Sequence, residues 1–184
     1  LRASEQERAD IAKARRAWRK EQRGLDPAKL IFLDESGAKT NLTRLRGRAQ
    51  RGERGHATSP QGHWKVTTMI SSIRVDGTTA CMTIDGATDT EVFRAYIQQV
   101  LSPTLRAGDV VIMDNLSPPK SDGTLGVIQQ QGAQVKFLPA YSPDLNPIEM
   151  MWSKVKTSLR SAEARTQPTL TQAVATALAS VTAQ

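Results

Sequence analysis

Aromatic residues, cysteine and histidine are all scarce in this chain of 184 residues. The aromatic side chains are three Trp, two Tyr and three Phe, so the core must be mainly aliphatic. The single cysteine, Cys81, excludes a disulfide framework and a cysteine-based zinc site. No apolar run approaches the roughly 18 residues of a membrane span, and the first residues show no signal-peptide pattern. We therefore expect a soluble, intracellular protein with no membrane partner.

The charge is shifted toward basic residues. Lys and Arg number 25 against 18 Asp and Glu, which gives a net charge of +7 at pH 7 and a pI near 9.9. A surplus of this kind favours a polyanionic partner, although it does not bear on the fold. The length predicts one main domain with a sizeable buried core.

The N-terminal segment is one of two basic regions. Residues 1–24 hold eight Lys or Arg and four acidic residues, with Ile11 and Trp18 as the large apolar anchors. This composition predicts a helix that is only weakly docked. It is either a solvated linker, a connector from another domain or a basic surface for nucleic acid.

Residues 39–54 form the densest positive stretch of the chain. Six basic residues stand there against Glu53 alone, with glycines between them. Arginines and backbone amides in a glycine-rich loop suit DNA phosphates, which contribute affinity without reading sequence. The candidate DNA contacts are Arg44, Arg46, Arg48, Arg51 and Arg54.

Apolar runs and turn signals predict a mixed sheet covered by helices. Strands are expected at residues 29–33, 64–75, 78–84, 110–113 and 135–138. Asp76-Gly77 is a strong hairpin signal between the second and third of them. Helices are expected at residues 89–101, 121–132, 147–160 and 168–183. The order of these elements indicates an α/β domain with five strands.

Three acidic residues stand where these elements begin or end. Asp34 and Asp114 each follow an apolar strand, and Glu149 lies in the first turn of the helix that opens at Asn146-Pro147. If the two strands are neighbours, the three carboxylates converge on one cleft. Such a site, without paired histidines or thiolates, suits Mg²⁺ or Mn²⁺. Two such ions promote in-line phosphoryl displacement, so the pattern points to metal-dependent phosphodiester chemistry.

Glu149 also has a purely structural explanation. Asn146 precedes it by three residues, as in a capping box, and a first-turn glutamate suits the helix dipole. The helix has an apolar face, which puts Glu149 at the edge of the buried surface, where it is both held and open to solvent. That face consists of Ile148, Met151, Trp152, Val155 and Leu159.

Three segments resemble the signature blocks of mariner-type DDE transposases, in their bacterial insertion-sequence branch. They are residues 33–37 (LDESG), 111–116 (VIMDNL) and 138–149 (LPAYSPDLNPIE). The 34 residues between Asp114 and Glu149 match the spacing of this group. The resemblance extends from about residue 30 to residue 160, and its last block is the most specific.

The resemblance implies an RNase H-like fold for residues 27–184, with residues 1–26 as a basic helical linker from an N-terminal DNA-binding region. Asp34, Asp114 and Glu149 would be the metal-binding triad, holding two Mg²⁺ or Mn²⁺ ions. The implied reaction is cleavage of DNA at transposon ends, followed by attack of the freed 3′ hydroxyl on target DNA. Lys120, and Lys156 on the same helix flank as Glu149, would contact phosphates.

The implied partners are double-stranded DNA and a second copy of the chain, in the bacterial cytoplasm at the nucleoid. One departure from the family pattern is Pro118-Pro119-Lys120, where the family has a histidine before the lysine. Two alternatives therefore stay open. The chain is either a non-catalytic DNA-binding remnant of a decayed transposase, or another RNase H-like endonuclease that acts without strand transfer.

Overall fold

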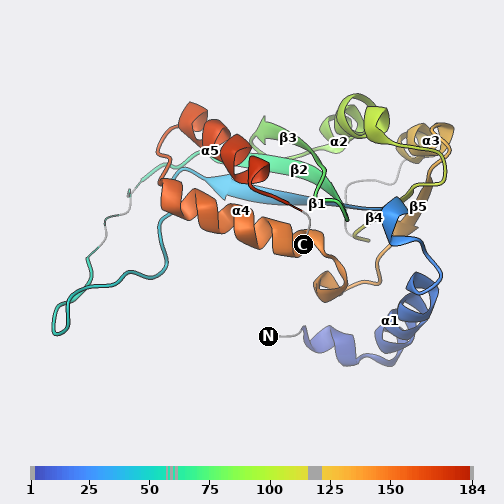
Figure 1. The fold of residues 1–184 in the computed structure, drawn as a ribbon, viewed down its shortest axis with the longest axis horizontal. Helices are drawn as coiled ribbons and strands as arrows, with labels where there is room; N and C mark the ends of the chain where they lie inside the picture. Colours follow the sequence, from blue (N-terminus) through green and yellow to red (C-terminus); the bar gives the residue numbers. More distant parts are fainter. Residues whose placement is uncertain (1–2, 57, 59, 61, 116–121, 183–184) are drawn as a thin grey trace.

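The fold is taken from a computed structural model that describes residues 3–56, 58, 60, 62–115 and 122–182 (Figure 1). The strands are β1 (Leu30–Lys39), β2 (Val66–Arg74), β3 (Thr79–Asp85), β4 (Val110–Met113) and β5 (Gln134–Phe137). The helices are α1 (Ala9–Gln22), α2 (Thr90–Tyr96), α3 (Asp122–Gln130), α4 (Ile148–Ala162) and α5 (Gln167–Ala179). Short helical turns are η1 (Ser4–Glu7), η2 (Pro27–Lys29), η3 (Ile97–Leu101), η4 (Ser102–Thr104) and η5 (Pro143–Leu145).

The five strands form one mixed sheet in the order β3-β2-β1-β4-β5. The first three are antiparallel neighbours, and β1, β4 and β5 run parallel. Gly77 takes the left-handed conformation (φ 82°) in the β2–β3 turn, where the Asp76 carboxylate accepts a hydrogen bond from the Thr78 N–H at 2.8 Å. The predicted α/β fold with five strands and its hairpin are therefore confirmed.

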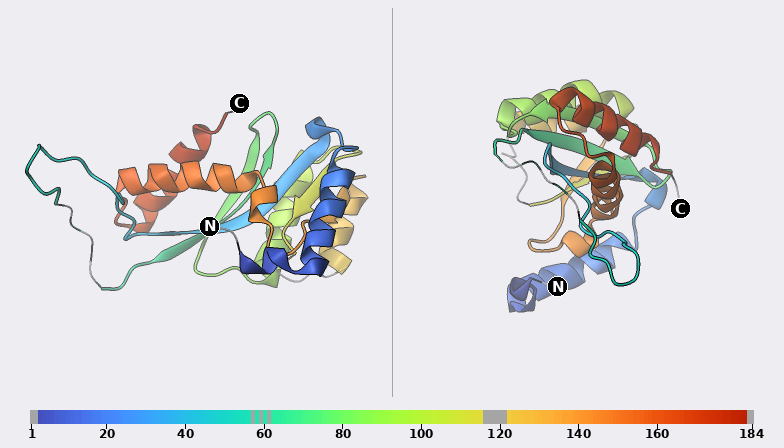
Figure 2. Two further views of the ribbon diagram at one scale, coloured as in Figure 1. Left: turned by 90° about the horizontal axis from the view of Figure 1, so that it is seen from below. Right: turned by 90° about the vertical axis from the view of Figure 1, so that its left-hand side faces the viewer.

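Helices cover both faces of the sheet (Figure 2). Side chains alternate along a strand, so Leu30 and Phe32 of β1 face the core under α4 and α5. Ile31 and Leu33 face the second core, which α2, η3 and α3 complete. In the described part of the chain, no helix is long and apolar enough to cross a membrane.

Strand β1 is longer than the sequence predicts. The prediction ends it at residue 33, but it continues through Asp34 to Lys39 because β2 pairs with it over that whole length. Pairing with β4 stops at Leu33, opposite Met113. Asp34 therefore lies at the point where β1 loses its second neighbour, rather than at the end of the strand.

The expectation of a weakly docked N-terminal helix is wrong. Trp18 is 5% exposed and belongs to the core that α4 and α5 share. Arg15, one turn earlier on the same face, is also buried, and Glu21 forms an ion pair with Lys136 of β5. The high charge of the segment lies on its outer face, so an overall count of charges does not reveal the inner contacts.

Candidate metal and DNA site

Asp34 of β1 and Asp114, the residue after β4, lie beside each other because β1 and β4 are neighbouring parallel strands. Leu33 pairs with Met113, and the two aspartates are the next residues of their chains. Alternation along the strands places both on the same face of the sheet as Phe32 and Ile112, which is the face under α4. The register thus brings together two of the three carboxylates that the sequence singles out.

Asp34 is tied to helix α4 through Trp152. The indole Nε1 of Trp152 donates to Oδ2 of Asp34 at 3.2 Å, and the Trp152 side chain is 1% exposed. The sequence identifies Trp152 only as a member of the apolar face. Residues three apart on a helix are neighbours on its surface. The spacing between Glu149 and Trp152 is therefore the feature of the sequence that could have indicated a role for Trp152 at the site.

The carboxyl group of Asp34 is electrostatically perturbed. Its pKa is raised from 3.8 to about 6, mainly by burial, and the negative charges of Glu149 and Asp114 add to the rise. Hydrogen bonds from the Glu35 backbone and from Trp152 oppose it. A carboxyl group that is partly desolvated and faces two others is a typical functional-site arrangement.

Glu149 occupies the first turn of α4, with its side chain exposed. The five residues predicted for the apolar face of this helix are all buried. Glu149 also lines a surface hollow of about 440 Å³, together with Gln22, Asn146, Met150, Ser153 and the residues of η5. The third carboxylate is therefore accessible from solvent and acts electrostatically on Asp34.

The predicted cap by Asn146 is wrong. Pro147 is the cap residue of α4, and no side-chain hydrogen bond from the described residues caps the helix. Asn146 is 6% exposed, and its backbone carbonyl, not its side chain, accepts from the Glu149 N–H at 3.2 Å. Its Oδ1 is buried without a hydrogen-bond partner among the described residues. The capping-box explanation for Glu149 loses its geometric basis.

Three carboxylates supply hard oxygen ligands, so the chemistry of the donor set fits Mg²⁺ or Mn²⁺. Over residues 3–56, 58, 60, 62–115 and 122–182, however, no three His, Cys, Asp or Glu side chains are gathered into a ready-made metal site. The three carboxylates therefore do not converge on one metal position in this conformation of the described residues. Glu149 is the exposed member of the three, whereas Asp34 and Asp114 are half-buried.

The basic segment after β1 projects away from the sheet (Figure 1). All five arginines proposed as DNA contacts are exposed in it. Its base is fixed, because Arg165 Nη1 donates to the Leu42 carbonyl at 2.7 Å and the Thr40 N–H donates to the Lys65 carbonyl at 3.2 Å. These arginines therefore lie on a separate arm rather than among the three carboxylates.

The DNA contacts predicted for Lys156 and Lys120 stay predictions. Lys156 is half-buried on α4, seven residues after Glu149, and so lies on nearly the same side of the helix. Lys120, with Pro118 and Pro119, lies outside the described residues.

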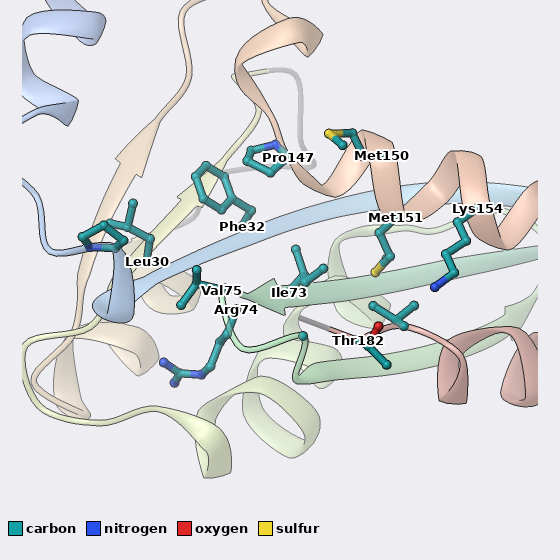
Figure 3. A pocket seen from close by; sticks show the side chains of 13 residues that line it. Leu30, Phe32, Ile73, Arg74, Val75, Pro147, Met150, Met151, Lys154 and Thr182 are labelled. Atoms are coloured by element: carbon teal, nitrogen blue, oxygen red, sulfur yellow. The ribbon is translucent and has the colours of Figure 1, made fainter. Parts of the chain in front are cut away.

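A separate apolar hollow of about 340 Å³ lies between the start of β1, the end of β2 and the other side of α4 (Figure 3). Phe32, Ile73 and Met151 line it, and Met150 and Thr182 lie at its edge. None of Asp34, Asp114 and Glu149 is among its lining residues. It is therefore distinct from the candidate site.

The family model described as "DDE superfamily endonuclease" matches residues 29–171. That range contains β1 to β5, α4 and all three carboxylates. No curated protein matches the sequence significantly.

Solved structures share the fold at low sequence identity. The Mos1 transposase paired-end complex with left transposon end has a TM-score of 0.70 at 16% identity, over 98% of this chain and 57% of that chain. The mariner Mos1 paired-end complex with Mg gives 0.67 at 15%, over 92% and 54%. The catalytic core domain of BIV integrase gives 0.53 at 15%, over 83% and 82%. The chain thus spans somewhat more than half of the Mos1 chains.

Proposed function

Because the chain belongs to the DDE superfamily endonuclease family, we propose that it is the catalytic region of a mariner-type transposase of the bacterial insertion-sequence branch. Its reaction would be cleavage of DNA at transposon ends and transfer of the freed 3′ end to target DNA. The observation that carries the proposal is the pairing of β1 with β4, which sets Asp34 beside Asp114 under the helix that bears Glu149.

Asp34, Asp114 and Glu149 would hold the divalent ions, and the proposed number is two. Structures of the mariner Mos1 complex name Mn and Mg, and the three oxygen donors here suit either. When bound, the ions would supply charge stabilisation for phosphodiester cleavage and strand transfer. The ligands would come from a strand, from the residue after a second strand and from the first turn of a helix.

The protein's own residues prepare this site in two ways. Trp152 holds the Asp34 carboxylate through its indole N–H and excludes water from the side under α4. The raised pKa of Asp34, about 6, leaves the group mainly ionised at neutral pH. Below that value it takes up a proton, and the site loses one anionic ligand.

The DNA substrate would lie along the positively charged arm and α4. The exposed arginines of residues 44–54 and Lys156 would contact phosphates, and Lys120 is proposed for the same role from the sequence alone. Residues 1–26 are proposed as the linker to an end-recognising region, and a homodimer as the assembly that holds two ends. Action on chromosomal DNA would place the protein at the bacterial nucleoid, in the cytoplasm.

One observation favours an alternative, a DNA-binding remnant without catalysis. No closed three-ligand group exists among the described residues, as expected if the ligands had lost their mutual geometry. The basic arm would still bind duplex. A third alternative, an RNase H-like endonuclease without strand transfer, would use the same carboxylates.

The deciding experiment is a Mn²⁺ titration with labelled duplex carrying candidate transposon ends. We expect cleavage by the parent chain, no cleavage by Asp34→Asn, and joined products when target plasmid is added. Equal cutting by the parent and Asp34→Asn would reject the assigned triad. Cutting without joined products would favour the endonuclease. Salt-dependent binding without cutting by either chain would favour the remnant.

A further inference from the structure

Arg15 of α1 reaches the turn that precedes α4. Its Nη1 donates to Ser142 Oγ at 2.7 Å and to Asp144 Oδ1 at 2.9 Å, and its Nη2 donates to Asp144 Oδ2 at 2.6 Å. The Arg15 residue is 8% exposed. The Asp144 side chain is 49% exposed, so the contact is only partly buried. A two-pronged contact between a guanidinium group and a carboxylate nevertheless fixes orientation as well as distance.

Other residues of the N-terminal segment attach to the same turn. Gln6 Nε2 donates to the Tyr141 carbonyl at 2.7 Å, and Trp18 packs in the core that includes Ile148. Glu21 pairs with Lys136 of β5, the strand that leads into the connection. Figure 2 shows η1 and α1 lying along η5 and the strands next to it. The segment therefore holds the β5–α4 connection at several successive points.

The turn itself has an unusual backbone. Tyr141 has φ 56°, in the left-handed region that is uncommon for a residue other than glycine. Such a conformation persists only where neighbouring contacts hold it. Ser142, which accepts from Arg15, also donates to the Ala140 carbonyl at 3.0 Å. The place where α4 begins, and with it the position of Glu149, depends on this turn.

We propose that Arg15 is a positioning residue for Glu149. By clamping Ser142 and Asp144, it sets the start of α4, and thereby brings the Glu149 carboxylate within range of Asp34 and Asp114. This inference rests on the proposed function, in which Glu149 is a metal ligand. The Arg15 hydrogen bond lowers the pKa of Asp144, so the clamp keeps both charges across the neutral range.

The test is direct Mn²⁺ binding by the full chain, measured by titration calorimetry, so that cleavage is not needed as a readout. The variants are Arg15→Met, Arg15→Lys, Asp144→Asn and Glu149→Gln. Arg8→Met is the matched control, because it removes an arginine from an exposed pair with Asp10 near the same helix. We expect Arg15→Met to weaken Mn²⁺ affinity roughly tenfold, as for loss of a group that orients a ligand. Arg15→Lys should weaken it less, and Arg8→Met should leave it unchanged.

A double variant separates positioning from general stability. If Arg15 acts through Glu149, Arg15→Met adds no further loss of affinity to Glu149→Gln. A purely structural role would lower the melting temperature of Arg15→Met and leave its Mn²⁺ affinity at the parent value, which would overturn the inference. If Arg15→Met does not fold, by circular dichroism, Arg15→Lys and Asp144→Asn decide the question with the same double variants.

Failure of the proposed function would look different. In that case Glu149→Gln would bind Mn²⁺ as tightly as the parent, or the parent would not bind it, whatever the Arg15 variants do. An Arg15 effect of equal size in the presence and absence of Glu149 would also refute positioning through Glu149, while leaving the metal site itself intact.

Discussion

The indole N–H of Trp152 donates a hydrogen bond to the carboxylate of Asp34 across 3.2 Å, joining helix α4 to the central strand. A donor of this kind stabilises the ionised form of the carboxyl group and so lowers its pKa. The bond connects the two elements that carry the first and third carboxylates. It makes the ionisation of Asp34 sensitive to a residue that sequence analysis assigns to the core.

Replacing Trp152 with phenylalanine removes this donor and keeps most of the apolar volume. The pKa of Asp34 should then rise above its present value of about 6. The pH below which Mn²⁺ affinity falls should therefore rise by about one unit, because a hydrogen bond to a charged group contributes about 1.5–3 kcal/mol. Mn²⁺ affinity measured between pH 5 and 8 checks this.

Trp18→Phe is the control for that variant. Trp18 is buried in the same core, and its Nε1 has no hydrogen-bond partner among the described residues. It should change stability without moving the pH profile. Equal shifts in both variants would mean that the effect comes from packing rather than from the bond to Asp34.

Asp34→Asn should stabilise the metal-free protein at neutral pH. The pKa of Asp34 is higher in the folded state than in the unfolded state. The free energy of unfolding therefore falls as the pH is raised from about 4 to above 6 and the buried group ionises. Asparagine avoids this cost. We expect a gain of about 1–2 kcal/mol at pH 7.5 and none at pH 4, after allowing for partial exposure of the group. Urea unfolding with a chelator present measures the difference, and a gain of equal size at both pH values would contradict it.

Arg74 and Asp109 form an ion pair at 2.6 Å, with side chains 8% and 4% exposed, between the end of β2 and the residue before β4. Removing only the cation leaves a buried carboxylate without its ion-pair partner, with the Arg106 N–H still donating to it at 2.7 Å. Arg74→Met should therefore lower the free energy of unfolding by about 3–5 kcal/mol. Chemical denaturation at pH 7 measures the loss. The double variant Arg74→Met with Asp109→Leu should recover part of it, and no recovery would argue against an unpaired charge as the cause.

The exposed arginines of the arm should govern the salt dependence of DNA binding. Substituting Arg46 and Arg48 with glutamine should reduce the slope of log affinity against log salt by about 0.9 for each phosphate that the protein no longer neutralises. Arg94→Gln serves as the control, because Arg94 is exposed on α2, which covers the face of the sheet opposite α4 and α5. Fluorescence anisotropy at several salt concentrations measures the slopes. An unchanged slope in the arm variant would remove these two residues from the interface.

Periodicity was enough to predict the parts of this fold that depend on local pattern. The apolar spacing along α4 identifies all five of its buried residues, and the continuous apolar run of β4 identifies a strand covered on both faces. The alignment of Asp34 with Asp114 follows once those strands are taken as neighbours.

Local sequence patterns do not predict contacts between segments that are far apart in the chain. Arg15 appears in the sequence as one of eight basic residues in a charged helix, although Asp144 lies 129 positions away. Asn146 has the residue type and spacing of a cap. It does not cap α4, because its side chain is buried and the helix begins at Ile148 with Pro147 as the cap residue. The sequence also predicts too early an end for β1, because pairing with β2 carries the strand past Asp34.

The parallel pairing of β1 with β4 has a consequence for how the protein folds. Leu33 and Met113 are 80 positions apart, and a parallel pair cannot form until the chain between them has been closed into a loop. The β1–β2–β3 meander can form earlier from nearby segments, and at that stage it carries only one of the three carboxylates. We therefore expect the three carboxylates to come together late in folding. A chain that stops before β4 would keep the positively charged arm but would lack two of the three carboxylates proposed as the metal site, Asp114 and Glu149.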